Sequence, residues 1–259
     1  MKVLLYQFHL NQSKLSFATK DKYINDYGEY WKLSSNTCKL YAEKWGWDYI
    51  FDNPTSEEWE PFFIPEPQFE QFRCIKYLKD YDAVLFVDSD ILIKPDSPNV
   101  VEEYKKNKTS IVVNTSIGNK LLGENDYSVI GVNTGVVIWY KDSNNIANLP
   151  YIKNDQYFDN GVYSLGSFLE SRGSIKWWKN LEDFESFIGK FESGFHNDDK
   201  FLTFLISIYN IPVSHLHSKY NYRFTNRTNS DILSDNIHFI HYIANMKSYI
   251  KQHYNLIMV

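Results

Sequence analysis

Blocks of apolar and polar positions alternate along the first half of the chain and predict strands and helices in turn. Val3–Phe8 is an apolar run that predicts a first buried strand. A helix is expected from Ser34 or Ser35, either of which can cap it, to about Trp45, because apolar residues recur there at helical spacing and Gly46 can end it. This alternation is typical of βαβ units and predicts an α/β fold.

The remaining periodic segments are shorter. Pro-rich and polar stretches between them, such as Asn53–Pro67 and Thr115–Ile130, predict loops. The region 144–194 has weak periodicity and is expected to form a lobe that faces a ligand. Strands are predicted at Asp48–Phe51, Ser110–Asn114, Gly135–Tyr140 and Ile237–Ile243, and helices at Gln68–Asp80, Asn99–Lys106 and Asp198–Tyr209.

The run Ala83–Ile93 has strand character but contains two acidic residues, Asp88 and Asp90. Burying carboxylates is costly unless a cation or hydrogen-bond donors accompany them. Two carboxylates one residue apart can reach a single hard divalent ion, and such an ion neutralises a diphosphate. In open α/β sheets ligands bind at the carboxyl ends of the strands, which is where these residues fall. For Asp-x-Asp taken alone, acidic residues that simply face water at a strand end remain the alternative.

The composition narrows the classes of partner. The net charge is −5 and no cluster of Lys and Arg occurs, which argues against binding to nucleic acid or to an anionic membrane. Aromatic residues make up 17% of the chain, which suits sugar binding but equally fits a Tyr- and Phe-rich core or an AT-rich genome. No window approaches 18 apolar residues, the length at which a transmembrane helix is considered.

Two cysteines, Cys38 and Cys74, lie in predicted helices among apolar residues. These apolar surroundings favour buried thiols over a disulfide, and the two cysteines do not have the spacing of a metal site. The N-terminal segment is too short and too polar for a signal peptide. We therefore expect a soluble, cytoplasmic protein.

Asp88-Ser-Asp90 and three later segments together resemble the metal-dependent glycosyltransferases of the GT-A fold, especially the glycogenin-like group. The resemblance covers most of Ala83–Lys247 as spaced motifs. It implies a Rossmann-like mixed sheet flanked by helices in one domain over residues 1–259, with a nucleotide-binding lobe to about residue 115 and an acceptor lobe beyond it. The later segments are Val132-Asn-Thr-Gly-Val-Val137, His196-Asn-Asp-Asp-Lys-Phe-Leu-Thr203 and Ile240-His-Tyr-Ile-Ala-Asn-Met-Lys247.

The resemblance also implies roles for particular residues. Asp88, Asp90 and His241 would bind Mn²⁺ or Mg²⁺, with Asp88 also binding the donor. Asn133 and Thr134 would line the donor-sugar pocket. Lys247 lies six residues after His241, as in the family, and would contact the diphosphate. Arg73 would lie toward the nucleotide, and Gly135 would allow close backbone approach.

Not every position fits the family pattern. Ala244 stands where the family has Gly, and His238 competes with His241 but lacks the spacing to Lys247. Tyr220-Asn-Tyr-Arg223 is a weaker match to a stretch that precedes the His segment in related enzymes. In the region 144–194, Trp177 and Trp178 are candidate acceptor contacts.

Asp198 and Asp199 are the candidate catalytic residues. Asp198 matches the family's Asp, whereas Asp199 stands where the family has Gln. A carboxylate there can act as a nucleophile or as the base of an inverting reaction. Helix capping is the alternative, and it is compatible with catalysis. The resemblance favours retention of anomeric configuration.

The implied activity is transfer of a sugar from a nucleotide diphosphate, with a UDP-sugar favoured, to a hydroxyl of a glycan, protein or small-molecule acceptor. A nucleotidyltransferase that forms sugar nucleotides is one alternative, but Phe8–Lys22 lacks the Gly-rich phosphate loop that such an enzyme needs. The other is a non-catalytic sugar-binding or scaffold protein derived from this fold. The matches to the family at Asp88, Asp90, His241 and Lys247 argue against a non-catalytic protein.

Overall fold

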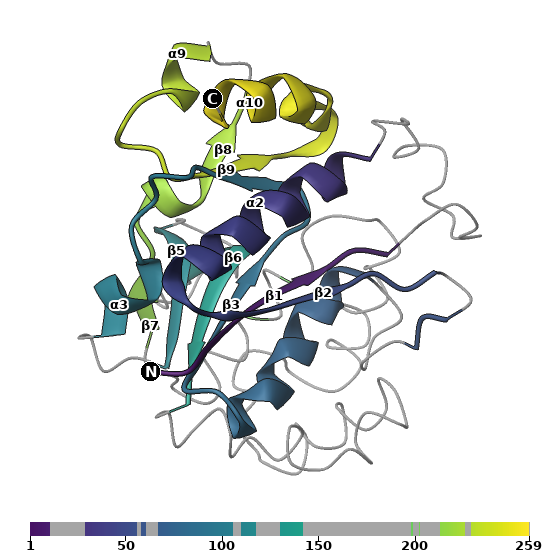
Figure 1. Cartoon of the computed structure of the whole chain (residues 1–259). Helices are drawn as coiled ribbons and strands as arrows, with labels where there is room; N and C mark the ends of the chain where they lie inside the picture. Colours follow the sequence, from purple (N-terminus) through teal and green to yellow (C-terminus); the bar gives the residue numbers. More distant parts are fainter. Residues whose placement is uncertain are drawn as a thin grey trace, which may run out of the picture.

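Two sheets and the helices around them form a mixed α/β structure (Figure 1). The structure, a computed structural model, describes residues 1–10, 29–55, 58–60, 67–105, 110–117, 130–141, 198, 202, 213–225 and 229–258. Its elements are β1 (Val3–Phe8), α2 (Tyr30–Trp45), β2 (Asp48–Asp52), η1 (Pro67–Lys79), β3 (Ala83–Val87), β4 (Ile91–Ile93), α3 (Val100–Tyr104), β5 (Ile111–Ile117), β6 (Ile130–Tyr140), β7 (Val213–His215), η4 (Ser218–Tyr220), β8 (Tyr222–Phe224), α9 (Asn229–Ile232), β9 (Phe239–Tyr242), η5 (Ala244–Tyr249) and α10 (Ile250–Ile257).

The larger sheet has six strands in the order β2-β1-β3-β6-β5-β7. Strand β1 runs parallel to β2 and β3, β6 runs antiparallel to β3 and β5, and β7 is parallel to β5. Strands β1 and β3 are buried along their whole length, which explains their near-continuous apolar sequences. The predicted α/β class, with a mixed sheet flanked by helices, is therefore confirmed.

A smaller sheet, in the order β4-β9-β8, lies next to α10 in Figure 1. Strand β4 pairs antiparallel with β9, and β8 pairs parallel with β9. The predicted single run Ala83–Ile93 thus supplies strands to both sheets, and Asp88, Ser89 and Asp90 form the turn between them. Two carboxylates one residue apart suit such a turn, because burying both charges inside a strand would be costly.

Helix α2 begins at Tyr30, so the prediction of a serine N-cap at Ser34 or Ser35 is wrong. Both hydroxyls make tertiary contacts instead: Ser34 Oγ donates to the carbonyl of Ile91 at 2.6 Å, and Ser35 Oγ contacts a tyrosine hydroxyl on β2 at 2.8 Å. The predicted end is confirmed, since Gly46 adopts the left-handed conformation with φ 68°.

Several other boundaries differ from the sequence predictions. The predicted helix at Gln68–Asp80 is helical but has 3₁₀ geometry. Strand β6 begins at Ile130 rather than Gly135, which places Asn133 and Thr134 inside a strand. Of the predicted helix Asp198–Tyr209, Asp198 and Leu202 are described. Region 144–194, which contains Trp177 and Trp178, lies outside the described residues.

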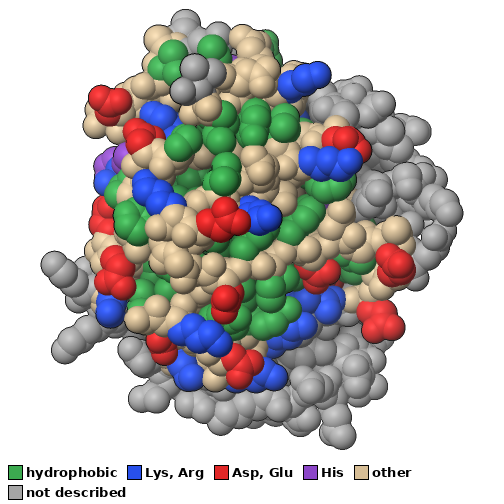
Figure 2. All heavy atoms as spheres, in the orientation of Figure 1, with side chains coloured by type: hydrophobic (Ala, Val, Ile, Leu, Met, Phe, Trp, Pro, Cys, Tyr) green, Lys and Arg blue, Asp and Glu red, His purple; other side chains and the backbone are tan. Residues whose placement is uncertain are grey.

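Other expectations concern the molecule as a whole. Cys38 and Cys74 are buried free thiols, as predicted. None of the helices in the described ranges is both long and apolar enough to cross a membrane. On the face shown in Figure 2, acidic and basic side chains are interspersed and neither sign gathers into one large area. The division into two lobes near residue 115 stays a prediction.

Candidate functional site

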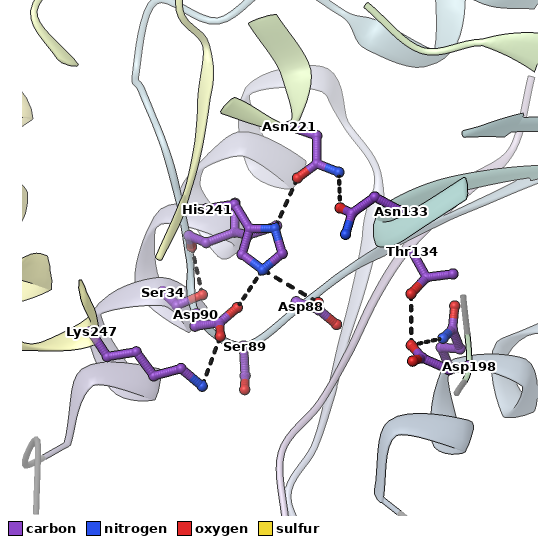
Figure 3. A network of polar contacts seen from close by, with 12 residues as sticks. Ser34, Asp88, Ser89, Asp90, Asn133, Thr134, Asp198, Asn221, His241 and Lys247 are labelled. Carbon is purple, nitrogen blue, oxygen red and sulfur yellow. Dashed lines mark hydrogen bonds and ion pairs between the residues drawn. The ribbon is translucent and has the colours of Figure 1, made fainter. Parts of the chain in front are cut away.

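The turn between β3 and β4 brings the two predicted carboxylates together at the carboxyl end of β3. The amide of Asp88 donates to the carbonyl of Gly135 on β6 at 2.8 Å, and the amide of Ile91 closes the turn on the carbonyl of Asp88 at 3.3 Å. Asp88 is partly exposed, whereas Asp90 is buried with 9% of its surface exposed. The turn therefore directs one accessible and one buried carboxylate toward the same region (Figure 3).

His241 on β9 completes this group from the smaller sheet, where it pairs with Ile91. Its Nε2 lies 3.3 Å from Oδ1 of Asp90 and 3.7 Å from Oδ2 of Asp88. One ligand atom from each of the three side chains can be chosen so that all lie within 4.8 Å of one another. The structure thus brings together the three residues predicted to bind a metal.

Two features of these residues fit a divalent cation. Although Nε2 of His241 lies 3.3 Å away, Oδ1 of Asp90 is buried and makes no hydrogen bond to any described residue. A buried carboxylate oxygen of this kind needs an explanation, and a bound ion supplies one. Nδ1 of His241 lies 2.9 Å from Oδ1 of Asn221, so that Nε2 is the nitrogen directed at the carboxylates. Two carboxylates and an imidazole suit Mn²⁺ or Mg²⁺.

Lys247 lies on the same side as the acidic turn. Its Nζ is 2.8 Å from Oδ2 of Asp90 and 5.2 Å from the ring centre of Tyr30, and a quarter of the side chain is exposed. Burial alone would raise the pKa of Asp90, but Lys247 and His241 hold it below its usual range. Burial would likewise lower the pKa of Lys247, but Asp90 raises it. Both groups are therefore charged near neutral pH.

Gly135 has no side chain and so leaves space for the imidazole ring of His241. An added Cβ at Gly135 would lie 2.5 Å from Cε1 and 2.6 Å from Nδ1 of His241, and 3.3 Å from Oδ1 of Asn221. The close approach expected at Gly135 from the sequence is thus made by protein side chains. The absence of a side chain at this position lets β6 and β9 bring the imidazole to the carboxylates.

Asn133 and Thr134 lie beside this centre on β6. Asn221 donates from Nδ2 to Oδ1 of Asn133, and Thr134 donates from Oγ1 to Oδ2 of Asp198 at 2.6 Å. Asp198 also accepts from Nε2 of Gln71 at 2.7 Å. Two donors therefore orient this candidate catalytic carboxylate next to the predicted donor-sugar residues (Figure 3).

Two predicted site residues remain, Arg73 and Asp199. The guanidinium of Arg73 donates from Nε to Glu70 at 2.5 Å and also bonds the carbonyl of Glu60. Its role toward the nucleotide stays a prediction. Asp199 lies outside the described residues, so its role also stays a prediction.

The sequence reasoning missed two residues that hold the acidic turn. Gln7 is fully buried on β1 and donates from Nε2 to the carbonyl of Asp88 and to Oγ of Ser34, both at 3.1 Å. Nδ1 of His9 contacts Oγ of Ser89 at 3.0 Å. Burial, reinforced by Lys247, lowers the pKa of His9 to about 4, so this ring is neutral. The signal for Gln7 was an amide within a buried apolar run, where an internal partner is required.

Comparison with known proteins gives matches among solved structures alone. No protein-family model matches the chain, and no curated protein matches it. The similar structures include a glycosyltransferase involved in the glycosylation of the major capsid of PBCV-1, with 11% identity, 99% of this chain and 100% of that chain covered, and a TM-score of 0.49. For the galactosyltransferase LgtC in complex with donor and acceptor sugar analogs, the identity is 10%, the coverages 100% and 97%, and the TM-score 0.48.

A third similar structure is mouse xyloside xylosyltransferase 1, with 10% identity, coverages of 95% and 99%, and a TM-score of 0.47. At such identities and TM-scores, any statement about chemistry has to come from the side chains of the site. These three similar structures are all glycosyltransferases.

Proposed function

We propose that this protein is a metal-dependent glycosyltransferase that moves a sugar from a nucleotide diphosphate, with a UDP-sugar favoured, to an acceptor hydroxyl. The observation that carries the proposal is the group formed by Asp88, Asp90 and His241, in which a buried carboxylate oxygen faces an imidazole nitrogen. This group lies at the carboxyl end of a central strand, where α/β sheets bind their ligands.

In this proposal Asp88, Asp90 and His241 hold Mn²⁺ or Mg²⁺. The bound ion supplies charge stabilisation for the diphosphate as it leaves. Lys247 adds a second positive charge on the same side, because its ammonium group lies 2.8 Å from Asp90. Without an ion, Lys247 keeps the Asp90 carboxylate ionised and therefore ready to act as a ligand.

Asn133 and Thr134 are proposed to line the pocket for the donor sugar, and Arg73 to lie toward the nucleotide. Asp198 is proposed to approach the anomeric carbon, since Thr134 and Gln71 fix its Oδ2. We propose Asp199 as the second catalytic carboxylate and retention as the stereochemical outcome. Proton NMR of the first-formed product from a donor of known configuration tests this; an inverted product contradicts retention, and full turnover by Asp199→Asn removes Asp199 from the chemistry.

A screen of UDP- and GDP-sugars for binding, hydrolysis and transfer, with Mn²⁺ or with excess EDTA, tests the function. We expect binding and turnover of a UDP-sugar that require the ion. Asp90→Asn should abolish metal-dependent turnover, and it is preferable to alanine because Asp90 forms an ion pair with Lys247. Asp96→Asn is the matched control, since Asp96 is an exposed residue after β4. Wild-type turnover in EDTA or in Asp90→Asn would contradict the metal assignment.

A further inference from the structure

A chain of three polar side chains connects the candidate metal centre to the candidate sugar pocket (Figure 3). It begins at His241 on β9, passes through Asn221 just before β8, and ends at Asn133 on β6. Oδ1 of Asn221 lies 2.9 Å from Nδ1 of His241, and Nδ2 of Asn221 donates to Oδ1 of Asn133. His241 and Asn221 are 7% and 4% exposed, so water cannot readily replace these bonds.

The protonation of an imidazole ligand determines which group donates and which accepts in each of these two hydrogen bonds. A neutral histidine that offers Nε2 to an ion carries its proton on Nδ1 and therefore needs a hydrogen-bond acceptor there. Asn221 meets this need when its oxygen faces the ring. Its amide nitrogen then faces Asn133, which must present its own oxygen in return. Nδ2 of Asn133, which can only donate, is turned away from Asn221 (Figure 3).

The reverse direction is disfavoured. Turning the Asn221 amide around would set its nitrogen against the Nδ1 proton of His241 and its oxygen against the oxygen of Asn133. An unsatisfied buried polar group costs about 1–3 kcal/mol. The His241 ring and Oδ1 of Asn221 also pack against Gly135 on the side where a Cβ would lie, which restricts how far either can move.

We propose that Asn221 is a positioning residue with two effects. It holds His241 with Nε2 toward Asp88 and Asp90, and it orients Asn133 so that the amide nitrogen faces the donor. The group that Asn133 recognises is then a hydrogen-bond acceptor, such as a hydroxyl oxygen of the sugar. This inference rests on the proposed function for the identity of the ion and of the donor.

The first effect is tested with Mn²⁺ alone, without nucleotide, by following free Mn²⁺ by electron paramagnetic resonance. Asn221→Leu removes both hydrogen bonds and should weaken Mn²⁺ binding by about 10–100-fold, the range found when groups behind a ligand are removed. Asn221→Asp keeps the acceptor for His241 and should bind Mn²⁺ at least as tightly as the wild type. Asn36→Leu is the matched control, because Asn36 bonds an exposed tyrosine hydroxyl on α10.

Rescue by Asn221→Asp separates positioning from a general loss of folding, since both variants remove the donor at position 221 that bonds Oδ1 of Asn133. Wild-type Mn²⁺ affinity in Asn221→Leu would overturn the first effect. Weakened binding in Asn221→Asp equal to that in Asn221→Leu would overturn it as well. Failure of the wild-type protein to bind Mn²⁺ would overturn both this inference and the proposed function.

The second effect is tested with Mn²⁺ present, by comparing the affinities for UDP, UDP-glucose and UDP-galactose. Asn133→Asp keeps an oxygen for Asn221 to bond but replaces the donating nitrogen. It should retain affinity for UDP and lose the added affinity that the sugar contributes. An unchanged sugar contribution in Asn133→Asp would overturn the second effect. If the wild type binds Mn²⁺ but none of these nucleotides, the preference for a UDP-sugar and the second effect fail, while the Mn²⁺ comparison still decides the first.

Discussion

Replacing Gly135 with alanine tests the packing that brings the candidate metal centre together. The new methyl group would lie 2.5 Å from Cε1 and 2.6 Å from Nδ1 of His241. Ordinary contacts between such atoms are about 3.5–4.0 Å long. The ring must therefore move by about 1 Å or the strands must separate by a similar amount. No unusual backbone angle contributes, since Gly46 is the one described glycine with positive φ.

A displacement of about 1 Å is large for a metal ligand, because bonds from imidazole nitrogen to divalent ions are about 2.1 Å long. It would also disturb the bond from Nδ1 of His241 to Asn221, which now measures 2.9 Å. We expect Gly135→Ala to weaken Mn²⁺ binding by about 10–100-fold. Overpacking should cost about 1–3 kcal/mol of folding free energy, or roughly 2–4 °C of Tm per kcal/mol in a protein of this size.

Isothermal titration with Mn²⁺ and thermal unfolding of the same samples measure both effects. Gly46→Ala is the matched control. Nothing lies within 4 Å of a Cβ added there, but its φ of 68° disfavours alanine by about 1–2 kcal/mol. This control should lower Tm and leave Mn²⁺ affinity unchanged. A Gly135→Ala protein that binds Mn²⁺ like the wild type would refute the packing argument.

Three further predictions follow from the surroundings of the acidic turn. Gln7→Leu should lower both stability in urea and Mn²⁺ affinity, because the Asp88 carbonyl loses its side-chain donor and keeps the longer bond from the Ile91 amide; unchanged Mn²⁺ affinity would contradict this role. Lys247→Met should weaken binding of UDP more than binding of uridine, since the diphosphate alone carries charge, and equal weakening would exclude a diphosphate contact. The lowered pKa of His9 contributes stability that is complete above about pH 6.5 and is lost as the pH falls through about 4. His9→Phe should therefore show a smaller fall in Tm than the wild type over that window, and parallel curves would contradict the assignment.

The residues of the site could be predicted from the sequence where local chemistry was unusual. Asp88 and Asp90 interrupt an apolar run, and the spacing from His241 to Lys247 matches a known motif. The structure places all four in one group, with contacts of 2.8 to 3.7 Å. Their roles toward a ligand stay predictions.

The parts that could not be predicted depend on contacts between distant segments. Gln7 reaches the carbonyl of Asp88 because β1 and β3 are neighbours in the sheet, which no local pattern reveals. Gly135 is needed by the ring of His241, which belongs to the other sheet. Helix α2 starts before the expected serines because their hydroxyls bond to other elements instead. In each case tertiary contacts outweighed local preference.

The pairing of β4 with β9 would couple binding of the proposed ion to formation of the smaller sheet. His241 lies opposite Ile91, and its neighbours Ile240 and Tyr242 pack into the apolar cluster with α10. A slip of one residue would reverse these faces and carry the imidazole away from the carboxylates. An ion present at about 100 times its dissociation constant would add about 2.7 kcal/mol to the correctly paired state alone. During synthesis the two carboxylates leave the ribosome long before His241. The complete set of ligands therefore forms only after β9 has paired with β4, and the proposed ion would stabilise that native register.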